Sequence, residues 1–137
     1  MDVLITGSTG MVGKSALYEC IKDDRINKIY LINRSRLGIK NPKISELVIK
    51  DFLLVKNLKS KIKSCNACFH CMGITSFGHN KKYYYEVTYE MTKLITELIY
   101  EINPSAVMKY VSGEGTNAKE NSKITWANVK GKAENYI

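Results

Sequence analysis

The sequence predicts an α/β protein of three layers, in which a doubly wound parallel sheet has the strand order 3-2-1-4-5. Short apolar runs alternate along the chain with longer amphipathic segments, and this alternation indicates strand–helix–strand units with right-handed crossovers. Three glycines follow the first apolar run at a spacing of three residues, which indicates a tight turn between a strand and a helix. The chain has 137 residues and therefore the length of one domain.

The first strand is expected at Val3–Ile5, an apolar run with the character of a buried parallel strand. The turn after it contains Gly7, Gly10 and Gly13, and the pattern becomes helical from Val12. Such a turn presents free backbone N–H groups and the positive end of a helix dipole, which attract phosphate. A side chain at Gly7 or Gly10 would keep a diphosphate away from the backbone, and one at Gly13 would hold the helix off the strand.

A P-loop is the competing interpretation of this stretch. Gly13-Lys14-Ser15 supplies the second half of that motif, but its first glycine would have to stand at Ser8. The run Leu47–Asp51 is the nearest candidate for a strand that ends in a magnesium-binding aspartate, and Lys50 interrupts it. We therefore favour a dinucleotide-binding turn, with a glycine turn that binds no ligand as the alternative.

The second buried strand is predicted at Lys28–Asn33, and Arg34 and Arg36 follow it without an acidic residue. In dinucleotide-binding sheets an acidic side chain near this point holds the ribose 2′-hydroxyl, whereas an arginine accommodates a 2′-phosphate. The pattern favours NADP as the cofactor, with NAD as the alternative. The interpretation of both arginines as ordinary loop charges stays open.

The middle of the chain contains three further predicted elements. A third strand is expected at Glu46–Lys50, a short lysine-rich helix at Val55–Ile62, and a fourth strand at Ala67–Met72, which Gly73 ends. Asp51 lies between the third strand and the helix, where it fits a helix N-cap or a turn.

The fourth strand and its approach contain a spacing that is typical of metal sites, with Cys65, Cys68 and Cys71 three residues apart and His70 beside them. Residues three apart on a strand point to opposite faces of the sheet, so the three sulfurs would not converge. We therefore predict no metal and interpret the cysteines as small apolar side chains. Neither His70 nor His79 is assigned a role.

The longest helix is predicted at Lys82–Asn103, because its apolar residues recur at helical spacing, and Pro104 ends it. The tyrosines at its start are assigned to surface packing or to a partner interface. A fifth strand is expected at Ala106–Val111, and a last helix begins near Lys123 or Trp126.

The net charge of +8 comes mostly from lysines spread along the chain, which indicates a solvated surface. Proteins that bind nucleic acid usually present a basic face with arginine and stacking aromatics. Because the charge here comes from dispersed lysines, no nucleic-acid partner is expected. No apolar run reaches membrane-spanning length, and the first strand begins too early for a signal peptide. We expect a cytoplasmic protein without membrane contact, whose four cysteines are free thiols.

Together these features resemble the short-chain dehydrogenase/reductase superfamily, in its extended or atypical branch of epimerase/dehydratase-like proteins. The resemblance lies in the order of strands and helices, the TGxxGxxG turn of Thr6–Gly13, the strand end YVSG at 110–113 and the segment WANVKGKAE at 126–134. It spans the whole chain and implies an NAD(P)-binding Rossmann domain over residues 1–137. The cofactor contacts that it implies are Thr6, Gly7, Thr9, Gly10, Met11, Val12, Gly13, Arg34, Asp51, Phe52, Cys71, Met72, Gly73 and Lys130.

The resemblance also implies a catalytic constellation, and this chain departs from it. The family uses Tyr-x-x-x-Lys on the helix after the fifth strand, and here Trp126 stands at the tyrosine position with Lys130 at the lysine position. An indole N–H donates a hydrogen bond but does not act as a general acid near neutral pH. Ser112 matches the serine that holds the substrate oxygen, although that position could instead fall on Glu114.

Two functions follow from these observations. One is an NAD(P)-dependent oxidoreductase or nucleoside-diphosphate-sugar epimerase-like enzyme that acts on a small molecule. The alternative is a non-catalytic module for dinucleotide sensing or protein interaction. The chain stops at Ile137 inside the last helix, so we expect the C-terminal substrate-binding portion to be absent. An exposed edge at the fifth strand would favour a homo-oligomer.

Overall fold

The computed structural model describes residues 1–137 and confirms the predicted sheet. Its strands are all parallel and follow the order β3-β2-β1-β4-β5. Their bounds are Asp2–Thr6 for β1, Lys28–Asn33 for β2, Ile44–Val48 for β3, Ala67–His70 for β4 and Val107–Tyr110 for β5. The central strand β1 pairs with β2 on one side and β4 on the other, whereas β5 pairs only with β4.

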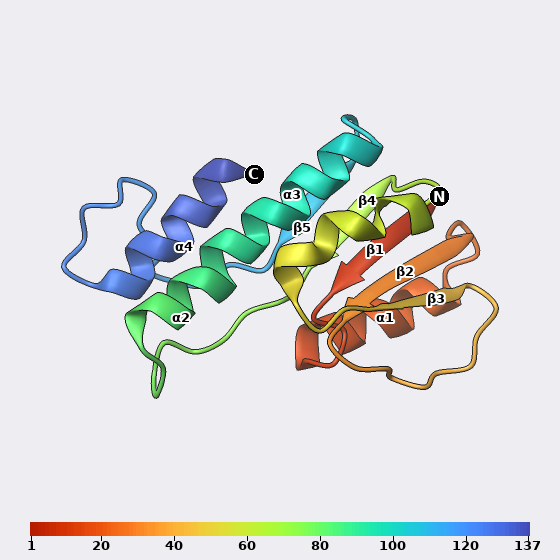
Figure 1. Ribbon diagram of the computed structural model, residues 1–137, viewed down its shortest axis with the longest axis horizontal. Helices are drawn as coiled ribbons and strands as arrows, with labels where there is room; N and C mark the ends of the chain where they lie inside the picture. The colour runs from red at the N-terminus through yellow and green to blue at the C-terminus, as the bar shows by residue number, and fades with distance from the viewer.

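Helical segments lie on both faces of this sheet (Figure 1). Helix α1 covers one face, and the 3₁₀ helix η1 and helix α3 cover the other. Their bounds are Met11–Lys22 for α1, Phe52–Lys61 for η1, Lys81–Tyr85 for α2, Glu86–Glu90 for the π-helical turn η2, Met91–Ile102 for α3 and Thr125–Tyr136 for α4. None of these helices combines the length and the hydropathy that crossing a membrane requires.

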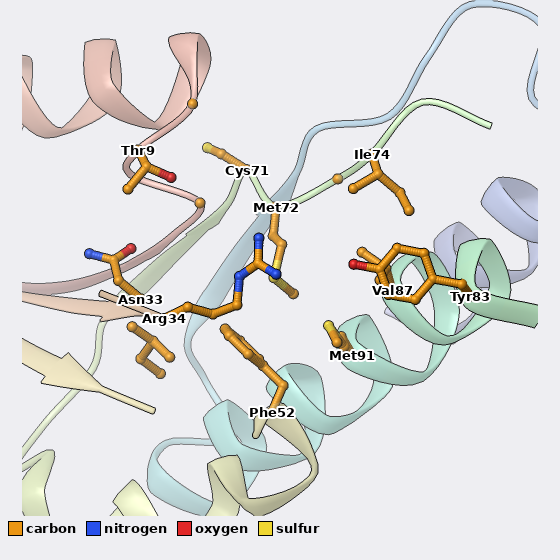
Figure 2. Close-up of a pocket in the computed structure, with 14 residues that line it drawn as sticks. Thr9, Asn33, Arg34, Phe52, Cys71, Met72, Ile74, Tyr83, Val87 and Met91 are labelled. Carbon is orange, nitrogen blue, oxygen red and sulfur yellow. The ribbon is translucent and has the colours of Figure 1, made fainter. Parts of the chain in front are cut away.

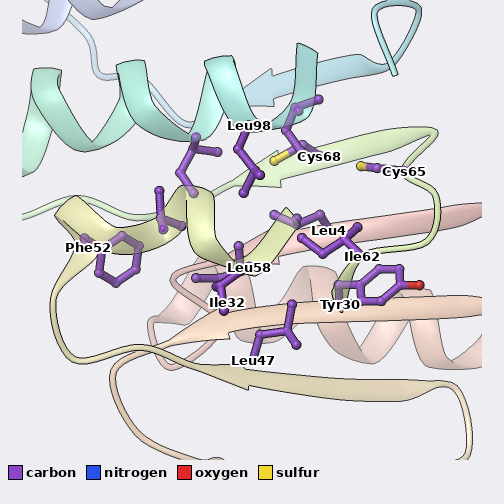
Figure 3. Close-up of a cluster of buried hydrophobic side chains, with 13 residues drawn as sticks. Leu4, Tyr30, Ile32, Leu47, Phe52, Leu58, Ile62, Cys65, Cys68 and Leu98 are labelled. Carbon is purple, nitrogen blue, oxygen red and sulfur yellow. The ribbon is translucent and has the colours of Figure 1, made fainter. Parts of the chain in front are cut away.

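The alternation of side chains along the strands divides the core into two parts. Val3 and Ile5 of β1 point toward α1, where they pack with Leu17. Leu4, between them, points to the other face and packs with residues of η1 and α3 such as Leu58 and Leu98 (Figure 3). All six of these side chains are buried, so the fully apolar run of β1 is explained by burial on both faces.

Two predicted strands differ from the observed ones by two residues at an end, whereas β1 and β5 differ by one residue at each end. The third strand begins at Ile44 and ends at Val48, two residues earlier than expected, because pairing with β2 sets its register from Ile44 opposite Ile29 onward. The fourth strand ends at His70 and not at Met72, because the chain leaves the sheet there and passes against the glycine turn.

The helices also correct the predictions in part. The predicted helix over 55–62 is a 3₁₀ helix that starts at Phe52, since the Asp51 carboxylate accepts a hydrogen bond of 2.9 Å from the Leu53 N–H and caps it. The long helix predicted over 82–103 contains the π-helical turn η2, which no apolar periodicity reveals. Tyr84 near its start is buried, so the assignment of this tyrosine to the surface was wrong.

Candidate functional site

The glycine turn between β1 and α1 is held by close backbone contacts. Gly7 has a φ of 69°, and a Cβ there would lie 2.7 Å from the carbonyl of Cys71. A Cβ at Gly13 would lie 2.2 Å from the Gly7 carbonyl oxygen, so α1 packs directly on the turn. Gly10 differs from both, because its Cβ would come no closer than 3.4 Å to another atom. The fold itself therefore requires glycine at Gly7 and Gly13, and not at Gly10.

This packing leads to a prediction for stability. Gly13→Ala is expected to lower the free energy of unfolding by about 2 kcal/mol, because the added methyl group forces α1 away from the turn. Gly113→Ala is the matched control, since a Cβ at Gly113 would meet only the Lys130 side chain at 3.8 Å. Urea unfolding of both variants measures the difference. Equal stability of Gly13→Ala and the parent would contradict the packing role.

A cavity of about 160 Å³ opens beside the turn at the carboxyl edge of the sheet. The cavity lies where the connections after β1 and β4 run to opposite faces of the sheet. Doubly wound sheets bind their ligands at such a switch point. Figure 2 shows Thr9, Asn33 and Arg34 on one side and an apolar wall on the other. The lining residues are Gly7, Thr9, Gly10, Ile32, Asn33, Arg34, Phe52, Cys71, Met72, Gly73, Ile74, Tyr83, Val87 and Met91.

The polar side of the cavity offers hydrogen-bond donors. The N-terminus of α1 has no side-chain cap and no acidic residue in its first turn, which leaves its positive dipole end available to an anion. Arg34 is exposed and makes no ion pair with the protein. Asn33 is buried, its Oδ1 accepts a hydrogen bond of 2.9 Å from the Ser8 hydroxyl, and its Nδ2 has no partner. This side of the cavity suits a ligand rich in acceptor oxygens.

Many of the predicted cofactor contacts gather at this cavity. Those that line it are Gly7, Thr9, Gly10, Arg34, Phe52, Cys71, Met72 and Gly73. The others lie outside its lining. Thr6 is buried behind the turn, Met11 and Val12 are exposed on the first turn of α1, Gly13 packs under it, and Asp51 caps η1. The N-cap interpretation of Asp51 therefore describes its role in the structure.

Sequence reasoning missed the apolar wall and one polar residue. Tyr83, Val87 and Met91 are four residues apart, so one face of the long helix brings them to the cavity. This spacing was the available signal, but it was assigned to surface packing and to the core. Nothing in the sequence marks Asn33 or Ile74 as lining residues.

The predicted catalytic residues lie together, outside the cavity lining. Trp126, Lys130 and Glu134 share one face of α4, and this face runs along the loop after β5. The Trp126 ring lies 3.4 Å from the position of a Cβ on Gly115, and the Lys130 ammonium lies 3.5 Å from the carbonyl oxygen of Val111. The Ser112 hydroxyl donates a hydrogen bond to the Glu134 carboxylate.

Burial changes the electrostatics of this cluster. It lowers the pKa of the Lys130 ammonium, and the negative charge of Glu134 opposes that effect. The Lys130 ammonium stands 5.4 Å from the centre of the Tyr110 ring. Burial, with Tyr84 and Glu134 nearby, raises the pKa of Tyr110 to about 12, so this phenol stays protonated near neutral pH. The cluster holds a cation and a neutral phenol beside a serine that is already hydrogen-bonded.

The cysteines predicted to be apolar lie in different surroundings. Cys65 and Cys68 are buried in the core on the α3 side, whereas Cys71 is half-buried and lines the cavity. No group of three or more histidine, cysteine, aspartate or glutamate residues is placed to hold a metal ion.

The sheet order and the helices on both faces define this chain as a protein with a doubly wound, Rossmann-like fold. No family model and no curated protein matches its sequence. Among solved structures it is similar to a short-chain dehydrogenase/reductase superfamily protein from Agrobacterium tumefaciens with bound NAD, at 16% identity and a TM-score of 0.74. The match covers 99% of this chain and 44% of that one.

Two further solved structures share the fold. One is a UDP-glucose 4-epimerase from Thermotoga maritima, at 15% identity and a TM-score of 0.75, covering 99% of this chain and 50% of that one. The other is a putative carbonyl reductase of Caenorhabditis elegans, at 13% identity and a TM-score of 0.79, covering 98% and 74%. The chain thus has the fold of short-chain dehydrogenase/reductase and epimerase proteins, and it spans about half the length of the Agrobacterium protein and of the epimerase.

Proposed function

We propose that this protein binds a nicotinamide dinucleotide in the cavity at the carboxyl edge of the sheet. Gly73 carries the argument, because it lines the cavity and a Cβ there would meet no atom within 4 Å. Its φ is not positive, so neither strain nor packing in the protein demands glycine at this place. A ligand that lies against the backbone does demand it. Gly10, which the fold also tolerates with a side chain, supports the same conclusion.

The residues present fit the parts of such a ligand. The uncapped N-terminus of α1 beside Gly10 suits the diphosphate, and the wall with Phe52 and Val87 suits the apolar faces of the adenine ring. Arg34 and the unpartnered Nδ2 of Asn33 are both donors, which suits the acceptor oxygens of a 2′-phosphate and supports NADP over NAD. When bound, the nicotinamide would supply hydride transfer.

The preference for NADP predicts an effect of Arg34. We expect the parent to bind NADPH more tightly than NADH, and Arg34→Ala to weaken NADPH binding by about tenfold while NADH binding is unchanged. A charge-assisted contact to a phosphate is lost only with NADPH. Fluorescence titration with both cofactors measures this, and Arg36→Ala is the control because Arg36 does not line the cavity. Equal affinities that Arg34→Ala leaves unchanged would remove the 2′-phosphate argument.

The role of Gly73 gives a second prediction. Gly73→Val is expected to weaken binding of both cofactors by about tenfold or more, since its side chain would occupy space that the ligand needs. Its melting temperature should stay close to that of the parent, because a Cβ at this position meets no protein atom within 4 Å. If Gly73→Val and Gly10→Val bind both cofactors as the parent does, the dinucleotide is not bound in this cavity.

For the reaction, we propose an NAD(P)-dependent oxidoreductase or epimerase-like enzyme acting on a small molecule, with Ser112 and Lys130 as substrate- and ribose-orienting residues. A non-catalytic dinucleotide-binding module is the second candidate. It is favoured by Trp126 at the position of the acid and by the engagement of the Ser112 hydroxyl with Glu134. We also propose a cytoplasmic location, and self-association through the unpaired edge of β5.

A further inference from the structure

A buried chain of hydrogen bonds runs behind the cavity, through the fully buried side chain of His70. The Nδ1 atom of His70 lies 2.7 Å from the Thr6 hydroxyl oxygen, and its Nε2 atom lies 3.0 Å from the Thr92 hydroxyl oxygen. The Thr92 hydroxyl in turn donates a hydrogen bond of 2.7 Å to the backbone carbonyl of Thr88. These contacts connect β1, β4 and the helix that follows the cavity loop.

The partners in this series of hydrogen bonds determine which atom donates and which accepts in each bond. The Thr88 carbonyl only accepts, so the single hydroxyl proton of Thr92 is used on it. The Thr92 oxygen must then accept from Nε2–H of His70, which places the proton of the neutral ring on Nε2. Nδ1 consequently accepts from the Thr6 hydroxyl. Only one tautomer of His70 satisfies all the partners.

Each member of the chain is the sequence neighbour of a residue that lines the cavity. Thr6 precedes Gly7 and His70 precedes Cys71, while Thr88 follows Val87 and Thr92 follows Met91. The hydrogen bonds therefore join the glycine turn on one side of the cavity to the apolar helix wall on the other.

The helix wall needs such an anchor, because its regular hydrogen bonding is interrupted there. The π-helical turn Glu86–Glu90 contains Val87 and Thr88, and π-helical turns are rare and concentrate at functional sites. On the side of β5, the Tyr110 ring stacks on His70 with the ring centres 5.7 Å apart. Of the charged groups, Lys130 lies near enough to act on His70.

We propose that His70 is a positioning residue for the ligand of this cavity: through Thr6 and Thr92 it holds the helix wall at a fixed distance from the glycine turn. This inference rests on the proposed function, because the affinity for the dinucleotide is the property that the distance sets. Fixing the walls before binding removes an ordering cost that the ligand would otherwise meet. His70 does not line the cavity itself and so acts through its neighbours.

The test separates the two links of His70. His70→Asn retains an acceptor for Thr6 but is too short to reach Thr92, and Thr92→Val removes the same link without changing the shape of the side chain. Each is expected to weaken NADPH binding by about tenfold, and the double variant is expected to show no further loss. Thr96→Val is the matched control, because Thr96 lies one turn further along α3, bonds the Thr92 carbonyl at 2.9 Å and does not join the chain.

The outcomes distinguish this inference from the proposed function. A parent that binds no dinucleotide overturns both. A parent that binds, with His70→Asn and Thr92→Val unchanged in affinity, overturns the inference alone. The inference alone is also overturned if Thr96→Val loses as much affinity as Thr92→Val, because general destabilisation of α3 would then explain the effect. Nitrogen NMR of the free protein gives a readout independent of binding. A proton on Nδ1 of His70 would contradict the proposed arrangement of hydrogen bonds.

Discussion

As the pH falls from about 6.5 to about 4, the free energy of unfolding is expected to decrease by about 3 kcal/mol because of His70 alone. Burial, assisted by the charge of Lys130, lowers the pKa of His70 to about 4 in the folded protein. The unfolded chain binds the proton near pH 6.5, so in this window the unfolded state holds more protons than the folded state. The stabilisation is therefore complete above pH 6.5 and is lost on acidification.

Urea unfolding at several pH values, with His70→Gln for comparison, measures this effect. The parent should lose stability between pH 6.5 and 4, and His70→Gln should lose much less. His79→Gln is the control, because His79 is the other histidine of the chain and is exposed. Asp23, Glu97 and Glu101 have lowered pKa values, so the stability that they contribute is lost only below about pH 4.5 and is common to all variants. Equal pH dependence in the parent and His70→Gln would show that His70 is not buried in its neutral form.

Trp126→Tyr is expected to raise the rate of NADPH-dependent carbonyl reduction over that of the parent by a factor of about 10² to 10⁴. A positioned acid contributes a factor of this size, and the indole of Trp126 does not supply a proton near neutral pH. Lys130 suits the role of partner to such an acid, because burial lowers the pKa of its ammonium group and because it lies one turn along the same face of α4. The assay uses NADPH with a panel of aldehydes and ketones.

Two controls isolate the hydroxyl group. Trp126→Phe makes the same change in ring size against Gly115 without adding an acid, and it should stay as inactive as the parent. Adding Lys130→Ala to Trp126→Tyr should abolish the gain. Robust turnover by the parent that Lys130→Ala does not reduce would show that the active site lies elsewhere. No gain in Trp126→Tyr, with NADPH still bound, would favour the non-catalytic module.

The sheet could be derived from the sequence because its signals are local. The apolar run Val3–Ile5, the glycines after it and the alternation with helical segments each lie within a few residues, and together they allow few topologies. The packing role of Gly13 was derived in the same way, since strand–turn–helix geometry leaves no room for its Cβ. Element ends such as those of β3 were shifted, because pairing with β2 sets them and pairing is not local.

The cavity and its support depend on residues far apart in the chain. His70 was assigned no role from the sequence, yet its two partners are 64 and 22 residues away, and the sheet order brings them to it. Asp51 fits a cofactor contact or a helix cap equally well as a sequence position, and the Leu53 N–H beside it makes it a cap. The apolar periodicity of the long helix marks Val87 and Met91 as inward-facing, but not whether they meet core or cavity. That depends on the distance between the helix and the glycine turn, which only the packing of β1, β4 and α3 together sets.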